Sequence, residues 1–316
     1  MKKYPLKLTP VTKSIIWGGK KIPELYDIGE KGSSVAEAWM LTCRNDGMNI
    51  IENGEYAGCT LEDYMKESGM TGDFPLLVKI IDAADRLSVQ VHPDDAYAHS
   101  HGIDMGKTEM WYILDAEPGA ELVAGIKTGI TPEQVANAAK EGRCEEYLNY
   151  VPVKKGDCFF IPAGLVHAIG KGILIAEIQQ NSNTTYRLYD YDRRDKDGNA
   201  RELHINEARE TIKTEFDSRA AVVNNVIIDD DDMEIIMLCH CEYFSVSKCK
   251  LAAGKKNELF CGERLFHFLC VDGSGYIEYD SVKYPIKKGD SYLLPASLTG
   301  KCVLEAEEGL EVIASY

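Results

Sequence analysis

The stretch KKGDCFFIPAGLVH at residues 154–167 decides the fold class, because a close copy of it, KKGDSYLLPASLTG, follows at residues 287–300. Six of the first eleven positions are identical in the two copies. Internal similarity of this kind indicates that one structural unit occurs twice in the chain. The first copy ends in His167 and the second in Gly300, so any chemistry of this histidine belongs to the first copy alone.

Short runs of β-branched and aromatic residues, bounded by Gly, Pro and Asp, predict a mainly β protein. In the first copy, Gly156-Asp157 is expected to turn the chain into a strand, and Pro162–Gly164 to turn it out again, so that His167 enters the next strand. The expected strands include Trp111–Leu114, Cys158–Ile161, Ile173–Ile178, Ile235–Leu238, Tyr276–Tyr279 and Ser291–Leu294.

The spacing G-x5-P-x-G-x2-H, from Gly156 to His167, resembles the second signature motif of the cupin superfamily. This resemblance implies two cupin-type jelly-roll β-barrel units with a few short helices. The acidic run Asp229–Asp232 is predicted to be a solvated turn, and we place the boundary just before it, between a first unit of residues 1–228 and a second of residues 229–316. Short helices are expected after Thr60, over Thr131–Lys140, over Glu145–Tyr150 and over Asn206–Lys213.

Polar side chains alternate with apolar ones in LSVQVHP, residues 87–93, so Ser88, Gln90 and His92 share one face of a predicted strand. Three polar side chains that face a barrel interior need partners, and a metal ion is one such partner. Lys107 and Glu109 are expected to share a face of the strand that follows.

Two imidazoles, a carboxylate and an amide oxygen form a ligand set that suits zinc. The sequence offers His92 and His167, Glu109, and Gln90 for these roles. The alternative is a hydrogen-bonded polar core without metal. The group Cys239-His240-Cys241 lacks the C-x2–4-C spacing of structural zinc sites, so it is interpreted as part of a strand.

The composition restricts the partners and the compartment. The formal net charge is −16, with 35 Lys and Arg against 51 Asp and Glu, which argues against nucleic acid and anionic membranes as partners. No apolar run approaches the roughly 18 residues of a membrane span, and no secretion signal is expected at the N-terminus. Most of the ten cysteines are interpreted as buried thiols of a cytoplasmic protein. The protein is expected to act as a monomer or a small homo-oligomer.

The chain closely resembles the type I phosphomannose isomerases in their short bacterial form. Trp17-Gly18 and Glu37-Ala38-Trp39 fit the opening strands of that family. The stretches that carry the resemblance are PLLVKIIDA at 75–83, LSVQVHPDD at 87–95, GKTEMWYI at 106–113, IPAGLVHA at 161–168 and TYRLYD at 185–190.

The resemblance implies that the first unit is catalytic and holds one zinc ion per chain, and that the second unit lacks the metal ligands. Arg187 matches the catalytic arginine, and Ser88 matches the serine that binds phosphate. Arg193 lies where larger members carry a different, lysine-containing segment, and we expect it to help bind phosphate. The implied zinc ligands are Gln90, His92, Glu109 and His167, and further residues that line the active site are Lys79, Lys107 and Glu177.

The implied reaction interconverts mannose 6-phosphate and fructose 6-phosphate by moving a proton between C2 and C1 through an enediolate. Zinc and Arg187 would stabilise its negative charge. The base is either Glu177 or a water molecule on the metal. Two other hypotheses stay open, an iron-dependent oxygenase and a sugar-binding cupin without catalysis. Lys79, Lys107 and Arg187 favour a phosphorylated substrate.

Overall fold

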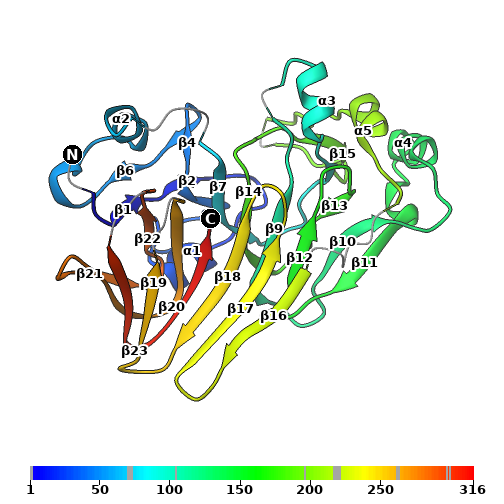
Figure 1. The fold of residues 1–316 in the computed structure, drawn as a ribbon. Coiled ribbons are helices and arrows are strands. Elements are labelled where there is room, and N and C mark those ends of the chain that lie inside the picture. The colour runs from blue at the N-terminus through cyan, green and yellow to red at the C-terminus, as the bar shows by residue number, and fades with distance from the viewer. Residues whose placement is uncertain are drawn as a thin grey trace.

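The computed structural model describes residues 3–69, 74–103, 105–195, 197–215, 222–260, 264–296, 298 and 300–316. Within these ranges the protein is mainly β, as predicted, and its helices are short (Figure 1). Ser297 and Thr299 of the second repeat copy lie outside the described residues. The sheets are open layers rather than closed barrels, which corrects that detail of the expected jelly rolls.

The first unit is built from two facing sheets. The six-stranded sheet has the order β12-β9-β14-β7-β3-β2, and the five-stranded sheet has the order β11-β10-β13-β8-β15. The strands of the first are β2 (Val11–Lys13), β3 (Glu37–Leu41), β7 (Leu76–Ala83), β9 (Glu109–Ala116), β12 (Cys158–Ile161) and β14 (Ile173–Gln180). Those of the second are β8 (Val89–Val91), β10 (Glu121–Ile126), β11 (Leu148–Pro152), β13 (His167–Ala168) and β15 (Tyr186–Tyr189).

Alternation along the strands determines what lies between the two sheets. Val89 and Val91 of β8 belong to a core cluster with residues of helices α4 (Pro132–Lys140) and α5 (Ile205–Thr211), on the outer side of the five-stranded sheet. The residue between them, Gln90, therefore points the other way, into the space between the sheets. This is the arrangement that the alternation of residues 87–93 predicts.

The strands β7 and β14 are buried at every position because both of their faces are covered. On one face, Ile81 and Ile175 join the cluster between the two sheets of the first unit. On the other face, Ile80 and Ile178 join the largest core cluster, which also contains Ile313 near the C-terminus. The first and second units thus share one hydrophobic core.

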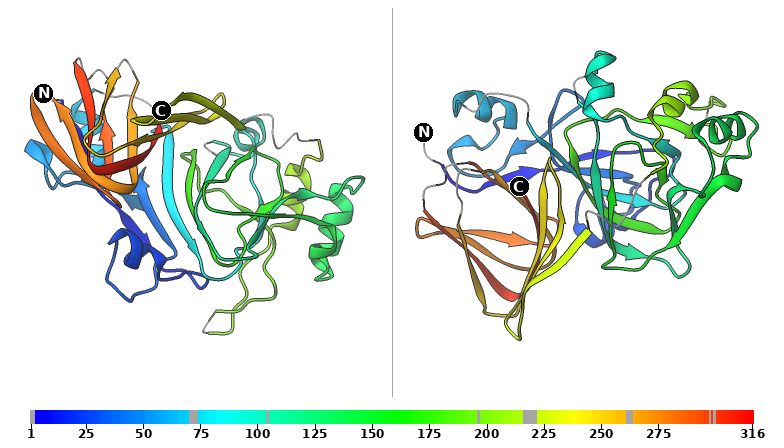
Figure 2. Two further views of the ribbon diagram at one scale, coloured as in Figure 1. Left: turned by 90° about the horizontal axis from the view of Figure 1, so that it is seen from below. Right: turned by 45° about the vertical axis from the view of Figure 1, so that its right-hand side comes forward.

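The second unit is centred on a ten-stranded sheet that also recruits the N-terminus. Its path is β16-β17-β18-β23-β20-β22-β1-β6, and β1 pairs with β22 of the second repeat copy (Figure 2). The strands are β1 (Leu6–Thr9), β6 (Ile50–Ile51), β16 (Val222–Asp229), β17 (Met233–His240), β18 (Ser245–Leu251), β19 (Lys256–Phe260), β20 (Phe266–Tyr279), β21 (Val282–Lys287), β22 (Ser291–Leu294) and β23 (Lys301–Ser315); β4 (Cys43–Arg44) and β5 (Gly47–Met48) pair apart.

The acidic run forms the turn between β16 and β17, in which the Asp230 side chain accepts hydrogen bonds from the backbone of Asp232 and Met233. The β16–β17 hairpin therefore crosses the proposed boundary at residue 228. The division of the chain into units of residues 1–228 and 229–316 stays a prediction.

Three of the four expected helices form where local signals favour them. Thr60 caps α2 (Leu61–Glu67), α5 begins one residue before the fourth expected range and ends two residues before its end, and Thr131 forms a capping box with Gln134 at the start of α4. The helix expected over Glu145–Tyr150 is wrong, because only a short 3-10 turn, Cys144–Tyr147, precedes strand β11, which pairs with β10. The helices α1 (Lys21–Tyr26) and α3 (Asp95–Ser100) were not expected.

Trp17-Gly18 does not open a strand, which corrects that expectation. Trp17 lies in a turn, and Gly18 makes an isolated bridge to Ala83 at the end of β7. Among the described residues, no helix is long and apolar enough to cross a membrane.

Candidate active site

Two rows of polar side chains face each other between the sheets of the first unit. On the five-stranded sheet, His167 and Arg187 are both paired with Gln90 of the strand between them. On the six-stranded sheet, Glu177 is paired with Lys79 on one side and with Trp111 on the other. The sheet registers therefore bring together residues that lie far apart in the sequence.

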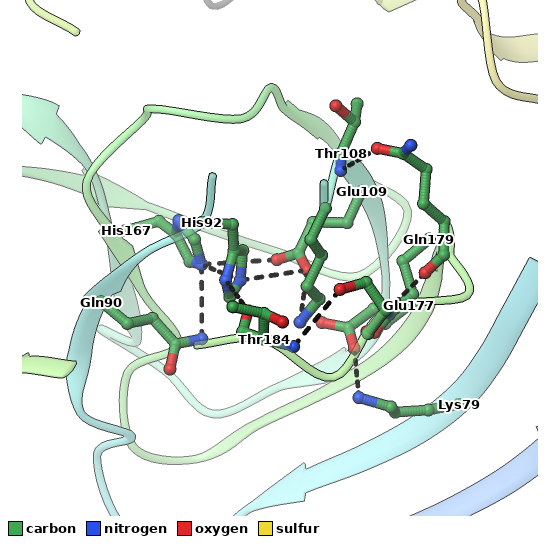
Figure 3. A network of polar contacts seen from close by, with 12 residues as sticks. Lys79, Gln90, His92, Thr108, Glu109, His167, Glu177, Gln179 and Thr184 are labelled. Atoms are coloured by element: carbon green, nitrogen blue, oxygen red, sulfur yellow. Dashed lines mark hydrogen bonds and ion pairs between the residues drawn. The ribbon is translucent and has the colours of Figure 1, made fainter. Parts of the chain in front are cut away.

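Three buried residues, His92, Glu109 and His167, converge on one point (Figure 3). One candidate ligand atom from each lies within 4.8 Å of the others. The two Nε2 atoms are 3.1 Å apart, and each is 3.5 Å from an oxygen of the Glu109 carboxylate. We call these three residues the His–Glu–His cluster.

The backbone orients both imidazoles of the cluster. His92 Nδ1 lies 2.9 Å from the Thr184 carbonyl oxygen, and His167 Nδ1 lies 2.8 Å from that of Leu165. Because each Nδ1 donates its proton to a carbonyl, each Nε2 keeps a lone pair that points into the cluster.

The Glu109 carboxylate tests whether this cluster suits a metal ion. Neither of its buried oxygens accepts a hydrogen bond from the described part of the chain, although the Lys107 ammonium lies 3.0 Å from Oε2. Buried carboxylate oxygens normally have partners. Two imidazole nitrogens and a carboxylate with free lone pairs fit a divalent metal such as zinc or iron.

The protonation states also suit metal binding. Burial lowers the pKa of His92 to about 3, and it lowers the pKa of His167 as well, so both rings are neutral. Burial alone would raise the pKa of Glu109, but Lys107 and the two histidines outweigh burial and hold that pKa well below its usual value. The resting cluster therefore offers two neutral imidazoles and one carboxylate.

Gln90 adjoins the cluster through its amide. Its Nε2 lies 3.3 Å from His167 Nε2, while its Oε1 lies 3.5 Å from the hydroxyl oxygen of Ser88. An amide rotated by half a turn would present Oε1 to the cluster and Nε2 to Ser88. The structure thus brings Gln90 next to the other three predicted ligands, with its nitrogen facing them.

A cavity of about 310 Å³ lies beside the cluster. It collects predicted site residues from both sheets, namely Lys79, Ser88, Gln90, Lys107, Glu177 and Arg187. It is also lined by polar residues that the sequence did not single out, namely Asn183, Thr185 and Arg201, and by Glu37, which was noted only as part of an opening strand.

Lys79 and Glu177 form a buried ion pair in the wall of this cavity. Lys79 Nζ lies 3.0 Å from Glu177 Oε1 and 3.9 Å from Glu37 Oε2. The other oxygen of Glu177 accepts a hydrogen bond of 3.0 Å from the Trp111 indole. Burial alone would lower the pKa of Lys79, but Glu177 and Glu37 outweigh burial and raise it, so Lys79 is an ammonium.

Arg187 enters the cavity from β15 without a carboxylate partner. Its Nε donates to the Ser88 hydroxyl over 3.3 Å, and one terminal nitrogen donates to the Glu202 carbonyl over 2.8 Å. No carboxylate of the described chain forms an ion pair with its guanidinium. Burial lowers the pKa of Arg187, and the nearby Arg201 guanidinium lowers it further.

The structure does not bring Arg193 into this cavity. Arg193 is paired with Asp190 over 2.5 Å, and it also donates to the backbone carbonyl of Arg86. A role for Arg193 in substrate binding stays a prediction. Arg201 lines the cavity in its place, and no local pattern marks it, because it lies in a loop after β15.

Comparison with known families identifies both parts of the chain. A family model for the phosphomannose isomerase type I catalytic domain matches residues 6–127, and one for the mannose-6-phosphate isomerase cupin domain matches residues 234–316. Fold and site together define a cupin protein with a candidate metal centre.

The relatives narrow this class to one family. Mannose-6-phosphate isomerase ManA of Bacillus subtilis is 40% identical over 93% of this chain and 94% of its own length. Mannose-6-phosphate isomerase of Streptococcus mutans is 34% identical over 99% of this chain and 98% of its own length. A crystal structure of the Bacillus subtilis mannose 6-phosphate isomerase has a TM-score of 0.91 at 33% identity and covers 100% of both chains. The chain belongs to the type I phosphomannose isomerase family.

Proposed function

We propose that the protein interconverts mannose 6-phosphate and fructose 6-phosphate, with one zinc ion held by His92, Glu109 and His167 and completed by Gln90. The observation that carries the proposal is the His–Glu–His cluster beside a cavity lined by lysine and arginine. The relatives that match nearly the whole chain support the reaction, because they are named for it.

The reaction moves a proton from C2 of the aldose to C1, with an enediolate between the two steps, and the hydroxyl proton of O2 is transferred to O1. The zinc ion, when bound, supplies positive charge that polarises the sugar oxygens. Arg187 supplies a second, permanent positive charge to the enediolate. No carboxylate in the described ranges forms an ion pair with this guanidinium, which supports the role, because its charge is left to act on the substrate.

Glu177 is our candidate for the base that carries the proton. It lines the cavity, and its carboxylate is held by Lys79 at 3.0 Å and by the Trp111 indole at 3.0 Å. The ion pair and the hydrogen bond together fix the orientation of the carboxylate, so one group can take the proton from C2 and return it to C1. Lys107, whose ammonium also lines the cavity, would add charge stabilisation near Glu109.

The number of metal ions and the compartment follow from the same proposal. The described residues contain one cluster of candidate ligands, and it lies in the first unit, which supports one zinc per chain. We also infer action in the cytoplasm, because a phosphorylated sugar is charged and is retained inside the cell that makes it.

The test is a coupled assay of mannose 6-phosphate isomerisation with wild-type protein, His167→Ala and the control His101→Ala. His101 is exposed on the loop after α3 and stacks on Tyr97. We expect turnover by wild type and His101→Ala, and loss of both zinc and turnover in His167→Ala. Oxygen consumption instead of isomerisation would favour the oxygenase, and tight sugar-phosphate binding without turnover would favour the binding protein.

A further inference from the structure

We propose that Arg201, held in place by Asp190, is the residue that binds the phosphate group of the substrate, together with the Ser88 hydroxyl. The proposal rests on the proposed function for the identity of the substrate. It assigns the binding of the anion to a residue outside the stretches that carry the family resemblance.

The first argument is the geometry of the Arg201 side chain. Asp190 Oδ2 accepts from Arg201 Nε over 2.8 Å, and Asp190 Oδ1 accepts from a terminal nitrogen over 2.5 Å. Two parallel hydrogen bonds fix the plane of a guanidinium. The second terminal nitrogen, NH1, donates to no group in the described part of the chain, and the residue lines the cavity. Arg201 is therefore held in a fixed orientation, and its nitrogen NH1 can donate hydrogen bonds to a ligand.

The second argument is the charge balance. Two guanidiniums, those of Arg193 and Arg201, share one buried carboxylate, Asp190, whose side chain is only 6% exposed. The Arg187 guanidinium lines the same cavity as Arg201, and the Asp85 carboxylate beside Arg193 is 56% exposed. The Glu202 carboxylate nearby is 83% exposed and is screened by water. A doubly charged phosphate would neutralise this local excess, in a chain whose net charge of −16 gives no long-range attraction to anions.

The third argument separates Arg201 from Arg193. Asp190, the Arg86 carbonyl and Asp85 (3.7 Å) take both terminal nitrogens of Arg193, whose side chain is 14% exposed and does not line the cavity. Arg201 is 30% exposed, so it is open to a ligand. Arg193 acts as the second partner of Asp190 and a positioning residue.

The fourth argument is the order of the residues along the cavity. Contacts run from the His–Glu–His cluster to Gln90, from Gln90 to Ser88, and from Ser88 to Arg187. Arg201 is a further basic residue in the lining of the same cavity. A sugar with C1 and C2 at the cluster would extend its C6 phosphate toward Arg201.

The experiment compares Arg201→Ala and Arg201→Lys with wild type and with Arg194→Ala. Arg194 is an exposed arginine of the same loop, and its side chain donates to the Gly198 carbonyl. Its replacement removes one positive charge from the loop and leaves Arg201 in place, so it is the control for a general loss of charge. Two quantities are measured on zinc-loaded protein: the binding of inorganic phosphate by calorimetry, and kcat/KM for mannose 6-phosphate. Calorimetry needs no turnover, so it tests the site even if the proposed reaction is wrong.

We expect Arg201→Ala to weaken phosphate binding and to lower kcat/KM at least about 30-fold, the usual cost of removing one partner of a buried charge pair. Arg201→Lys keeps the charge but loses the two parallel hydrogen bonds to Asp190. Its phosphate affinity and kcat/KM should therefore lie between those of wild type and Arg201→Ala. Arg194→Ala stays within about twofold of wild type.

The inference is overturned if Arg201→Ala is folded by circular dichroism and binds phosphate as tightly as wild type. It is also overturned if Arg194→Ala loses as much phosphate affinity as Arg201→Ala. A third outcome separates the two proposals. If the wild-type protein has no isomerase activity but binds phosphate, and Arg201→Ala loses that binding, the proposed reaction is refuted and the anion site stands. If Arg201→Ala does not fold, the same comparison between Arg201→Lys and wild type decides.

Discussion

Arg187 and Glu109 show how a single missing partner points to function. Both are charged, and Arg187 lines the cavity that lies beside Glu109. In the described part of the chain, the Glu109 oxygens accept no hydrogen bond although Lys107 lies 3.0 Å away, and the Arg187 guanidinium forms no ion pair with a carboxylate. Such incompletely satisfied charged groups cost free energy in a fold, so their retention is best explained by a ligand that completes them.

At the residue scale we predict that Arg187→Ala lowers kcat by about 10²–10³-fold, the usual effect of removing an electrostatic stabiliser of the transition state. Zinc content and secondary structure should be unchanged, because Arg187 contacts Ser88 but none of the His–Glu–His cluster. Steady-state kinetics and metal analysis on the same sample check this. A near-normal kcat with a raised KM would assign Arg187 to uniform substrate binding.

The sequence singled out most of the polar residues that the structure gathers in the cluster and the cavity, but not their contacts. The alternation of residues 87–93 indicates the side chains that face inward, and the repeat indicates that His167 is special. Arg201 was missed because its place in the cavity depends on Asp190, eleven residues away, and not on any local spacing. The orientation of the Gln90 amide likewise depends on contacts across strands.

At the element scale, the turn between β12 and β13 connects the repeat motif to the metal site. Gly164 adopts φ +94°, and its backbone nitrogen donates to the His92 carbonyl over 2.8 Å. A Cβ at this position would lie 2.8 Å from the Lys213 side chain and 3.1 Å from the Thr211 carbonyl oxygen. The glycine therefore permits both the turn and its close packing against the segment after α5.

We predict that Gly164→Ala destabilises the fold and weakens zinc binding, and Gly156→Ala is its matched control. Gly156 has φ +90°, with nothing within 4 Å of an added Cβ. Both variants should lose about 1–2 kcal/mol through left-handed strain. Only Gly164→Ala should also lose zinc affinity, because it displaces the turn that holds His92 and His167. Denaturant unfolding and zinc titration measure the two effects, and equal zinc affinity in both variants would contradict the prediction.

Secondary structure was predictable where local signals agree with the tertiary fold. The strands β12 and β22 were predicted with the bounds that the structure gives them, and Thr131 marks the start of α4. The helix expected over Glu145–Tyr150 failed, because pairing of β11 with β10 overrides a local preference. Such long-range pairing cannot be derived from one segment alone.

At the scale of the whole molecule, the two repeat units share a sheet and a core. Strand β1 pairs with β22, and the largest core cluster combines Leu6 and Ile178 with Leu269 and Ile313. The repeat predicted two similar units, but it carried no information on how they join, since the joining strands lie at opposite ends of the chain.

We therefore predict that the units unfold together. Thermal unfolding followed by circular dichroism and by calorimetry should give one coincident transition, because separating the units would expose their common core. A fragment of residues 1–228 should not fold alone, since β1 would lose its pairing with β22. Two resolved transitions, or a stable and cooperative fragment, would show that the second unit is independent.

The central claim is that a single zinc ion at the His–Glu–His cluster is required for the isomerisation of mannose 6-phosphate. The most direct measurement is the initial rate of samples that are stripped by a chelator and then reloaded to known zinc contents. The account predicts a rate that rises in proportion to bound zinc and levels off at about one ion per chain. Full activity in metal-free protein, or a rate that levels off only at about two ions per chain, would contradict it.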